Sequence, residues 1–421
     1  MTIQKLISGA ATYTVSVVFV IALTISCVNG VLAQGGRSVS ADRYPGTDLG
    51  AKINAADKAL GPGKGEIVVS GGGTISTQIV LSSDHVLRFQ PGTYVSRTNT
   101  IPIVMKPRSS VVGSGWDAII TESNLPEQFT VISAYNHSVH NGSADNGLVI
   151  RDIQIKGANP GFNSAYQAIS LGNCSNCLVD KVWINGTRAI GIQLGGAGDS
   201  GNLAENSKVT NCQFTRVASQ NLALTNGRNI VFEGNRFITS GQVGGPGNTN
   251  IDLEPNSPLD HLVNVLVRNN FIDVRNSEAH TTGSGIIAQT GAATRIGPII
   301  IENNTIIGGS DEGAITNILS NGIAVYGDNM KDVIIRNNTI RRTGQSGIRV
   351  QGARIVVTNN KLADVGGGGI PGFYVATFDS EITNNSITSK GQQPIDNRMI
   401  VHKDSRRNVI RNNPGWIVTP E

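Results

Sequence analysis

The chain has 421 residues, with 34 Lys and Arg against 30 Asp and Glu, so its formal net charge is only +4. No dense run of Lys and Arg is interleaved with aromatic residues, so the sequence gives no support for nucleic-acid binding. Glycine is frequent, at 51 residues, whereas aromatic and charged residues make up only 5% and 15% of the chain. This composition is typical of an extracellular β protein.

Residues 1–33 have the pattern of an export signal. Lys5 lies near the start, an apolar run extends from Val15 to Val28, and Val31-Leu32-Ala33 provides a small-residue cleavage site. A retained membrane anchor is the alternative, but the uninterrupted apolar run is shorter than the ~18 residues that a span requires. We therefore expect a mature protein that begins near Gln34, is secreted, periplasmic or held at the cell surface, and has no stable membrane span.

A short amphipathic helix is predicted after a polar lead-in over residues 34–47. Its apolar residues are spaced by 4, 3 and 4 positions: Leu49, Ile53, Ala56 and Leu60. This spacing places them on one face of a helix that ends at Gly61-Pro62-Gly63. We expect residues 48–120 to hold this helix, which must cover other structure, and the first strands. Those strands are expected around Glu66–Val69, Gln78–Leu81, Val86–Phe89 and Ile101–Met105.

The rest of the chain, residues 121–421, repeats one pattern: an apolar strand, an Asn pair and a second short apolar strand. The clearest copies are IIIENNTII at 299–307 and VIIRNNTIRRT at 333–343. Taking the second position of each pair as a marker gives Asp152, Lys181, Cys212, Asn235, Asn270, Asn304, Asn338, Asn360, Asn385 and Asn413. Successive markers are 22 to 35 residues apart, a period that indicates a solenoid, propeller or array.

Within each unit, two or three short strands rich in Ile and Val indicate one coil of a parallel β-helix. The windows show neither the Leu/Asn framework of a leucine-rich repeat nor the helices of ankyrin or tetratricopeptide units. Asn suits the corner of such a coil, because it tolerates the left-handed conformation and can hydrogen-bond to its stacked neighbour. We predict an all-β solenoid of roughly ten or more coils, with the helix as its N-terminal cap.

Four further segments carry a family resemblance: GAKINAADKAL, GEIVVSGGGTI, LRFQPGTYV and SSVVGSGWDAII. Together with the repeats, which extend the likeness over roughly residues 44–415, they resemble the pectate-lyase superfamily of secreted parallel β-helices. The resemblance implies a right-handed parallel β-helix and a polysaccharide held across one face of its strands. This superfamily includes lyases, hydrolases, epimerases, tailspikes and adhesins, so the fold does not name the reaction. The signatures of polygalacturonases, alginate epimerases and calcium pectate lyases are not evident.

The longest connections gather around one strand. They precede three successive strands and follow two of them: Gly241–Thr249, Arg275–Gly283, Gly308–Ser320, Pro255–Leu262 and Thr290–Gly297. Loops stacked on successive coils build walls, and insertions on one face commonly mark the binding face. We therefore expect a groove around residues 241–320.

Asp252 and Glu254 lie on the floor of this predicted groove. The inward assignment of Ile251 and Leu253 sends both carboxylates outward, with their Cα atoms about 6.6 Å apart. Two like charges this close raise one pKa, as an acid/base pair of a retaining or inverting glycosidase requires. A shared divalent cation such as Ca²⁺ and a simply solvated pair are the alternatives.

Tyr326 and Arg349 are further catalytic candidates, two and three coils away on the same face. In β-elimination a base removes the proton beside a uronate carboxylate while a cation or metal neutralises that carboxylate. These roles are open to Tyr326, Arg349, the loop residue His280 or Lys331. Tyr326 could equally be a platform for a sugar ring, and Arg349 could form a surface salt bridge. Candidates for substrate binding are Gln193, Thr225, Gln289, Gln351 and His280.

These patterns favour an extracellular polysaccharide-active enzyme, either a lyase or a glycoside hydrolase. A non-catalytic, glycan-binding or adhesin-like surface protein is the alternative. Cys174 and Cys177 form a CxxC between two strands without a second CxxC or a His pair, so zinc is not supported. We expect one local disulfide or stacked buried thiols, including Cys212. At the C-terminus, we expect Trp416 to lie over the last coil.

Overall fold

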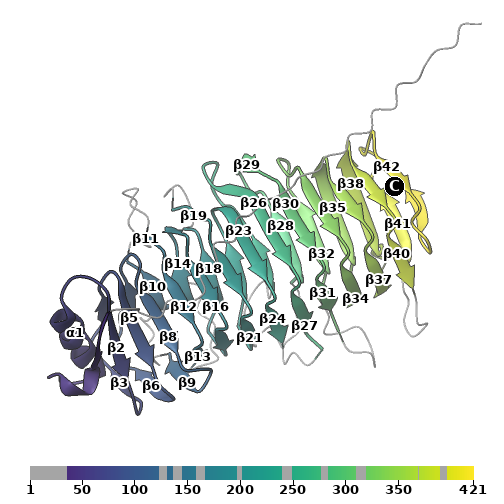
Figure 1. The fold of residues 1–421 in the computed structure, drawn as a ribbon. Helices are drawn as coiled ribbons and strands as arrows, with labels where there is room; N and C mark the ends of the chain where they lie inside the picture. The colour runs from purple at the N-terminus through teal and green to yellow at the C-terminus, as the bar shows by residue number, and fades with distance from the viewer. Residues whose placement is uncertain are drawn as a thin grey trace, which may run out of the picture. The chain divides into compact units, whose positions relative to one another are not determined.

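The computed structural model describes residues 36–122, 130–135, 145–157, 166–196, 202–238, 249–275, 283–309, 319–367, 369–388 and 396–421. In this part of the chain, nearly every element is a short strand that pairs in parallel with its equivalent one coil away (Figure 1). Three sheets result, of 18, 13 and 12 strands, which we call sheets A, C and B. The predicted parallel β-helix is confirmed.

Each coil contributes one short strand to sheet B and one to sheet C, and one or two to sheet A. Sheet A contains β1 (Arg37–Ser40), β2 (Gly65–Val69), β5 (His85–Phe89), β8 (Ser110–Gly113), β11 (Asp145–Asn146), β12 (Val149–Arg151), β15 (Cys174–Ser175), β16 (Leu178–Asp180), β19 (Ala204–Glu205), β20 (Lys208–Thr210), β23 (Gly227–Glu233), β26 (His261–Arg268), β29 (Arg295–Ile296), β30 (Ile299–Glu302), β33 (Val333–Arg336), β36 (Val356–Thr358), β39 (Glu381–Thr383) and β42 (Val409–Arg411). Sheet B contains β3 (Gly73–Ile75), β6 (Gly92–Ser96), β9 (Ala118–Thr121), β13 (Gln154–Lys156), β17 (Trp183–Asn185), β21 (Gln213–Thr215), β24 (Arg236–Ile238), β27 (Phe271–Asp273), β31 (Thr305–Ile307), β34 (Thr339–Thr343), β37 (Lys361–Val365) and β40 (Ser386–Thr388). Sheet C contains β4 (Ile79–Leu81), β7 (Ile103–Met105), β10 (Thr130–Ala134), β14 (Gln167–Leu171), β18 (Ile190–Leu194), β22 (Leu222–Leu224), β25 (Ile251–Leu253), β28 (Ile286–Gln289), β32 (Ile323–Tyr326), β35 (Ile348–Ala353), β38 (Phe373–Phe378), β41 (Arg398–Val401) and β43 (Ile417–Pro420).

The core is a stack of inward apolar side chains, one set per coil. Along sheet C the strand register aligns a column of fully buried residues: Ile169, Ile192, Leu222, Ile251, Ile286, Ile323, Ile348, Phe373 and Met399. Since side chains alternate between the two faces of a strand, this column fixes which residues face outward. The inward and outward assignment made from the sequence is therefore confirmed for these strands.

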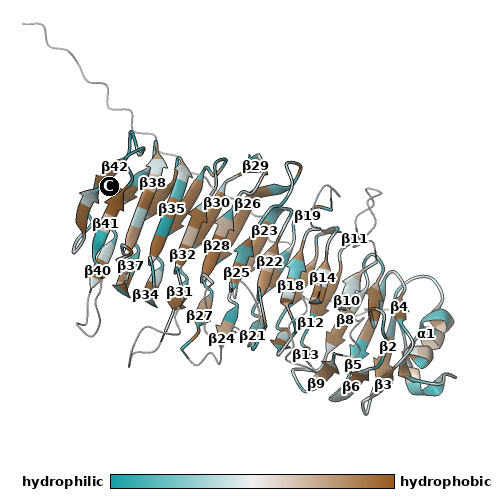
Figure 2. Cartoon of the chain, turned by 180° about the vertical axis from the view of Figure 1, so that it is seen from behind, coloured by the Kyte–Doolittle hydropathy of each residue, from teal (hydrophilic) through white to brown (hydrophobic). Residues whose placement is uncertain are grey.

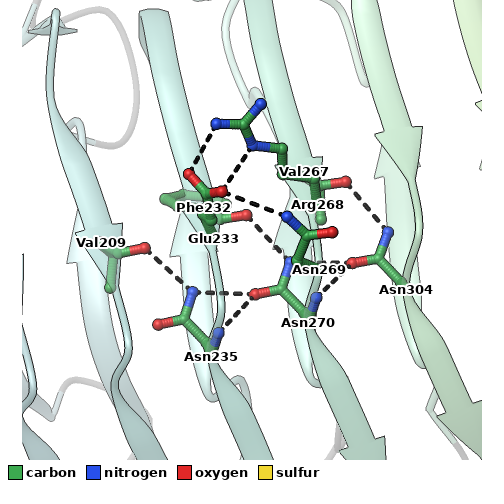
Figure 3. A network of polar contacts seen from close by, with 9 residues as sticks. All are labelled: Val209, Phe232, Glu233, Asn235, Val267, Arg268, Asn269, Asn270 and Asn304. Atoms are coloured by element: carbon green, nitrogen blue, oxygen red, sulfur yellow. Dashed lines mark hydrogen bonds and ion pairs between the residues drawn. The ribbon is translucent and has the colours of Figure 1, made fainter. Parts of the chain in front are cut away.

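The two residues of the Asn pair at the corner after sheet A have different structural roles. The first member adopts a positive φ, as in Asn269 (φ 55) and Asn303 (φ 56). The second member is buried and forms a ladder, which Figure 3 shows around Asn270. Asn270 Nδ2 donates to Phe232 O and to Asn304 Oδ1, and Asn270 Oδ1 accepts from the Nδ2 and backbone N of Asn235, at 3.0 Å in each case.

This division corrects two of the repeat markers. Asp152 and Lys181 have positive φ values of 54° and 52°. They therefore correspond to the first, left-handed member of the later pairs, and the ladder position follows one residue later. In these two coils the marker was placed one residue early, so the spacing up to Cys212 is 30 residues and not 31, whereas Cys212 itself follows the left-handed Asn211 and was placed correctly.

The two ends of the described chain are closed differently. Helix α1 (Leu49–Leu60) begins at the N-cap Asp48, whose Oδ1 accepts from Gly50 N at 2.8 Å, and its buried face includes Ile53 and Ala56, as predicted. The preceding segment is more than a lead-in, since β1 pairs with β2 and starts sheet A. At the other end, Trp416 packs edge-on against Phe373 with ring centroids 5.6 Å apart and is 8% exposed.

The cysteines follow the first of the two predicted states. Cys174 and Cys177 form a disulfide, and Cys212 is a buried free thiol. Burial raises the pKa of Cys212 to about 12, so this thiol stays protonated.

Candidate functional site

The outward side of sheet C carries the candidate site. Figure 2 shows hydrophilic sections on some strands of this sheet, such as β18 and β35, beside strands that are largely hydrophobic. The register places these outward residues on successive strands from β18 to β41: Gln193, Ala223, Asp252, Ile287, Ala324, Arg349, Tyr374 and Ile400. Asp252 and Arg349 thus share one column, as the sequence predicted.

Asp252 is the unusual residue of this column, since an outward-facing carboxylate is expected to be solvated. It is only 5% exposed, and its Oδ1 meets no hydrogen-bond partner among the described residues. Burial, followed by the charge of Glu254, raises the pKa of Asp252 to about 7, while a hydrogen bond from Gln220 acts in the opposite direction. The Asp252 carboxyl is therefore a group that takes up and releases a proton near neutral pH.

Glu254 continues the same strand and stays in the stack, because its backbone N donates to Leu224 O at 2.9 Å. Its side chain is half-buried. Burial raises the pKa of Glu254, and a hydrogen bond from Asp252 opposes that change. The two carboxyl groups therefore interact directly, and the more exposed Glu254 is the one that holds a negative charge more readily.

Tyr326 lies close enough to the carboxyl pair to feel both charges. Burial raises the pKa of its phenol, the charges of Asp252 and Glu254 raise it further, and Arg349 acts in the opposite direction. The structure thus brings the four predicted catalytic candidates into one electrostatic neighbourhood. A phenol with a raised pKa is a poor general base, but it can still donate a hydrogen bond or support a sugar ring.

Arg349 forms no salt bridge within the described residues, contrary to the alternative considered from the sequence. Its guanidinium lies over the Tyr374 ring at 4.9 Å from the centroid. Tyr374 in turn meets His402, with ring centroids 6.2 Å apart. An exposed guanidinium that lies over a ring, and that forms no salt bridge in the described part of the chain, is able to contact a ligand.

The residues predicted to bind substrate separate into three groups. Gln193 Nε2 donates to Thr225 Oγ1 at 3.2 Å, and Thr225 is buried. Both residues lie on coils that precede Asp252, and they contact each other. Gln289 is half-buried and aligned with Tyr326, and Gln351 lines a pocket further along the sheet. His280 lies outside the described residues.

The structure describes both of the connections that were predicted as one wall of the groove, residues 255–262 and 290–297. The loop after β25 is organised by Asp260, whose Oδ2 accepts from the backbone N of Asn256 and Ser257 at 2.9 Å each. The next coil packs closely on it, since a Cβ at Gly291 would meet Pro255 O at 2.6 Å. The opposite wall was predicted over connections whose residues 239–248, 276–282 and 310–318 lie outside the described part of the chain.

Metal binding was considered for the carboxyl pair. Within the described ranges, no group of three or more His, Cys, Asp or Glu side chains is placed to hold a metal ion. Ca²⁺ takes 6–8 oxygen ligands, and Asp252 with Glu254 supplies only part of such a set. A buried carboxyl that binds a proton near pH 7 fits acid/base chemistry better than a cation site.

Four residues near the site were not singled out from the sequence. Gln220 comes from the turn before β22 and reaches Asp252, and Tyr374, His402 and Arg406 lie around the pocket that contains Gln351. Tyr374 and His402 occupy the outward columns that the repeat alignment defines, which is a signal that could have identified them. The turn residue and Arg406 had no such signal.

Together, the three sheets, whose strands pair in parallel from coil to coil, define the chain as a parallel β-helix, the fold that the resemblance implied. A family model described as a right handed beta helix region matches residues 321–416. The sequence is 26% identical over 252 residues to the uncharacterized protein YclG of Bacillus subtilis (strain 168), which covers 55% of this chain and 42% of the relative. The match thus spans less than half the length of that relative.

Three solved structures show the same fold at low sequence identity. The A-module of mannuronan C-5 epimerase AlgE4 from Azotobacter vinelandii has a TM-score of 0.57 at 14% identity, covering 91% of this chain and 97% of that one. PfbA, a surface adhesin of Streptococcus pneumoniae, has a TM-score of 0.57 at 15% identity, covering 91% and 93%. A double mutant of the tailspike protein of E. coli bacteriophage HK620, in complex with a pentasaccharide, has a TM-score of 0.57 at 13% identity, covering 90% and 75%.

Similar proteins therefore include one that acts on a polysaccharide and one that binds an oligosaccharide. In the described part of this chain, no helix combines the length and apolar character needed to cross a membrane.

Proposed function

We propose that this chain is an extracellular polysaccharide-active enzyme that binds a glycan across sheet C. The observation that carries the proposal is the pair of adjacent carboxyl groups on the outer face, of which Asp252 is 5% exposed and has an unpartnered oxygen. Burying a carboxyl group in this way is unfavourable for folding, so its presence on a binding face favours a functional role. The HK620 tailspike double mutant, which is in complex with a pentasaccharide, supports an oligosaccharide as a ligand of this fold.

Hydrolysis fits the geometry better than β-elimination. Below a pH of about 7, Asp252 carries the proton that a general acid donates to the glycosidic oxygen. Glu254, half-buried and more readily ionised, then serves as the general base or the nucleophile. β-Elimination would instead use Tyr326 as the base, and the raised pKa of this phenol disfavours its ionised form. A lyase remains the second candidate, because the exposed Arg349 could neutralise a uronate carboxylate.

The test is incubation of the protein with a panel of acidic and neutral polysaccharides. New reducing ends without ultraviolet-absorbing unsaturated products indicate hydrolysis, both signals together indicate a lyase, and binding without either signal indicates the adhesin-like alternative. On the substrate found, Asp252→Asn and Glu254→Gln should each lower turnover by about 10²-fold or more. Glu302→Gln is the matched control, because it removes a carboxylate on sheet A that pairs with Arg336. Turnover within a few-fold of wild type in both site variants would end the assignment.

A cation at the carboxyl pair makes a different prediction. If Asp252 and Glu254 hold Ca²⁺, added Ca²⁺ should raise the melting temperature of the wild type and not that of either variant. If they act as an acid/base pair, the melting temperature should respond to Ca²⁺ equally in all three proteins. Activity should also fall as pH rises through about 7, where Asp252 loses its proton.

A further inference from the structure

Two tryptophans contact each other on the outside of the chain, away from sheet C. Trp116 lies in the turn between β8 and β9, and Trp183 is the first residue of β17 in sheet B. Their ring centroids are 5.5 Å apart and their planes meet at 53°. Trp116 is 37% exposed and Trp183 is half-buried, so the pair, which we call the indole platform, forms an aromatic surface open to solvent.

The strand register shows that the platform faces outward. In sheet B, Trp183 pairs with Gln154 of β13 and with Gln213 of β21, and the next residue of β17, Ile184, is fully buried. Since alternate side chains of a strand point to opposite faces, Trp183 points away from the core. Asp252 belongs to sheet C, two coils further on, so the platform is not part of the face that carries the carboxyl pair.

Both indole N–H groups are already used within the protein. Trp116 Nε1 donates to Lys181 O at 2.7 Å, and Trp183 Nε1 donates to Thr215 Oγ1 at 2.8 Å. These bonds hold the rings in place and leave their faces and edges to meet a ligand. A ligand that binds here must therefore offer C–H groups, and it finds rings whose positions are fixed beforehand.

A purely structural role explains only part of this arrangement. Ile153 and Val182 follow the left-handed corner residues, where later coils have the ladder Asn, and Trp116 reaches past the coil of β12 to Lys181 O. That contact braces three coils that have no Asn ladder. It does not account for an indole that stays 37% exposed, since an aromatic side chain stabilises a fold mainly through burial.

Polar groups lie beside the platform on sheet B. Thr215 Oγ1 donates to Asn185 Oδ1 at 3.2 Å, so Asn185 Nδ2 is able to donate to a ligand. Asn185 lies two residues after Trp183 on the same face, and Gln213 lies beside Trp183 on the next strand. Two aromatic rings with a few amide and hydroxyl groups beside them are the groups with which proteins bind a sugar ring.

Charge and size indicate a neutral sugar and not a protein surface. The segments that build the platform, 114–121, 149–157 and 178–187, contain three acidic and three basic residues: Asp117, Asp152, Asp180, Arg151, Lys156 and Lys181. The platform therefore has no excess charge to attract an acidic ligand. Among the described residues, the other exposed large hydrophobic side chains lie elsewhere: Tyr135, Leu259, Val409, Ile417 and Val418. Two rings alone are far smaller than the roughly 1,000 Å² that a stable protein interface buries.

We propose that Trp116 and Trp183 bind a neutral pyranose residue of a glycan by stacking, at a second glycan-binding site on sheet B. Because the site is separate from the carboxyl pair, it holds a long polymer at the protein without taking part in its cleavage. The inference goes beyond the proposed function, since it concerns a face that the proposed chemistry does not use, and it can be tested by binding alone.

The test uses the indole fluorescence of the full chain, in the Asp252→Asn background to prevent turnover. The chain has three Trp, and Trp416 is buried at the C-terminal end, so a ligand-dependent change in emission reports on the platform. The probes are hexamers of β-1,4-linked glucose, xylose and mannose, and a hexamer of galacturonate. At least one neutral hexamer should change the emission, and Trp116→Ala should weaken that binding by about 10-fold, the scale of one stacked ring.

Trp116→Phe keeps a ring and should recover most of the affinity, although it also lacks the N–H that donates to Lys181 O. Comparison of the two Trp116 variants therefore separates stacking from bracing. Val409→Ala is the matched control, because it removes exposed apolar surface from the last coil. Urea unfolding of each variant verifies that it is folded.

The proposal is overturned if no neutral hexamer changes the emission, if Trp116→Ala binds as tightly as Trp116→Phe, or if Val409→Ala loses as much affinity. It is also overturned if the galacturonate hexamer depends on Trp116 as strongly as the neutral ones, or if sedimentation shows that Trp116 instead joins two copies of the chain. Binding of a neutral hexamer at the platform without turnover of any polysaccharide would keep the site and reject the enzyme. Turnover by the wild type with no change in emission would do the reverse.

Discussion

Replacing Asp252 with Asn should make the protein more stable at neutral and alkaline pH. The Asp252 carboxyl is buried and has a pKa raised from 3.8 to about 7, so its ionised form is unfavourable in the folded state. Between these two pH values the folded protein binds more protons than the unfolded chain, and the free energy of unfolding therefore falls as pH rises. The loss through this one group is complete above a pH of about 7 and absent below about 4.

The size of the effect follows from the shift. Each pKa unit corresponds to about 1.4 kcal/mol, so ionisation of Asp252 removes at most ~4 kcal/mol from the free energy of unfolding. Asn has nearly the same shape and no charge, and it avoids this loss. Any new contacts of its amide add a constant, so the measurement that matters is how the difference between variant and wild type changes with pH.

The assay is urea unfolding of both proteins between pH 4 and pH 8, with refolding checked at each pH. The difference in the free energy of unfolding should shift in favour of Asp252→Asn by about 3 to 4 kcal/mol across this range. Asp84→Asn is a control whose difference from wild type should stay nearly constant over this range, because a hydrogen bond from Arg108 lowers the pKa of Asp84 below 3.8 and its stabilising ionised form is lost only below a pH of about 4. A difference for Asp252→Asn that does not vary with pH, or that favours the variant more at low pH, would refute the reasoning.

Two stability predictions follow from the core and the corner. Trp416→Ala should lower the free energy of unfolding by about 3 kcal/mol or more, because the indole covers the last coil against Phe373, and a variant as stable as wild type in urea would contradict that role. Asn304→Ala should cost more than ~2 kcal/mol, because it removes the hydrogen bonds that Asn304 Oδ1 accepts from the backbone N and Nδ2 of Asn270 and that Asn304 Nδ2 donates to Asn338 Oδ1. Asn303→Gly, at the left-handed position next to it, should change the urea midpoint little, and equal losses in both variants would show that the ladder is not what stabilises the corner.

The register of sheet C could be predicted from the sequence because its side chains alternate with a period of two. Ile251 and Leu253 identify the inward side, and Asp252 and Glu254 must then face outward. The burial of Asp252 could not be predicted in the same way. It depends on Gln220 from a turn and on how tightly neighbouring coils and loops cover the strand, which no alternation pattern encodes.

The pocket that Gln351 lines, at the C-terminal end of sheet C, could not be predicted from the sequence either. Gln351, Tyr374 and Arg406 come from three coils, and the lengths of the connections between them set where their tips meet. At the corner, prediction from the sequence was inaccurate by one residue. The sequence does not say which residue of a corner adopts the left-handed conformation. At Asp152 and Lys181 the repeat marker was therefore placed on the left-handed residue and not on the one after it.

The Asn ladder also allows the length of the solenoid to change by one whole coil at a time. Adjacent ladder positions such as Asn304 and Asn338 are 34 residues apart, and each coil contacts mainly its two neighbours. Excising one such period between β28 and β35 would rejoin the ladder and bring Tyr374 closer to Asp252 by one strand spacing, about 4.8 Å, while both ends of the face kept their own side chains. If the proposed glycan spans this face, its preferred length would then change in whole steps, by the number of coils, rather than continuously.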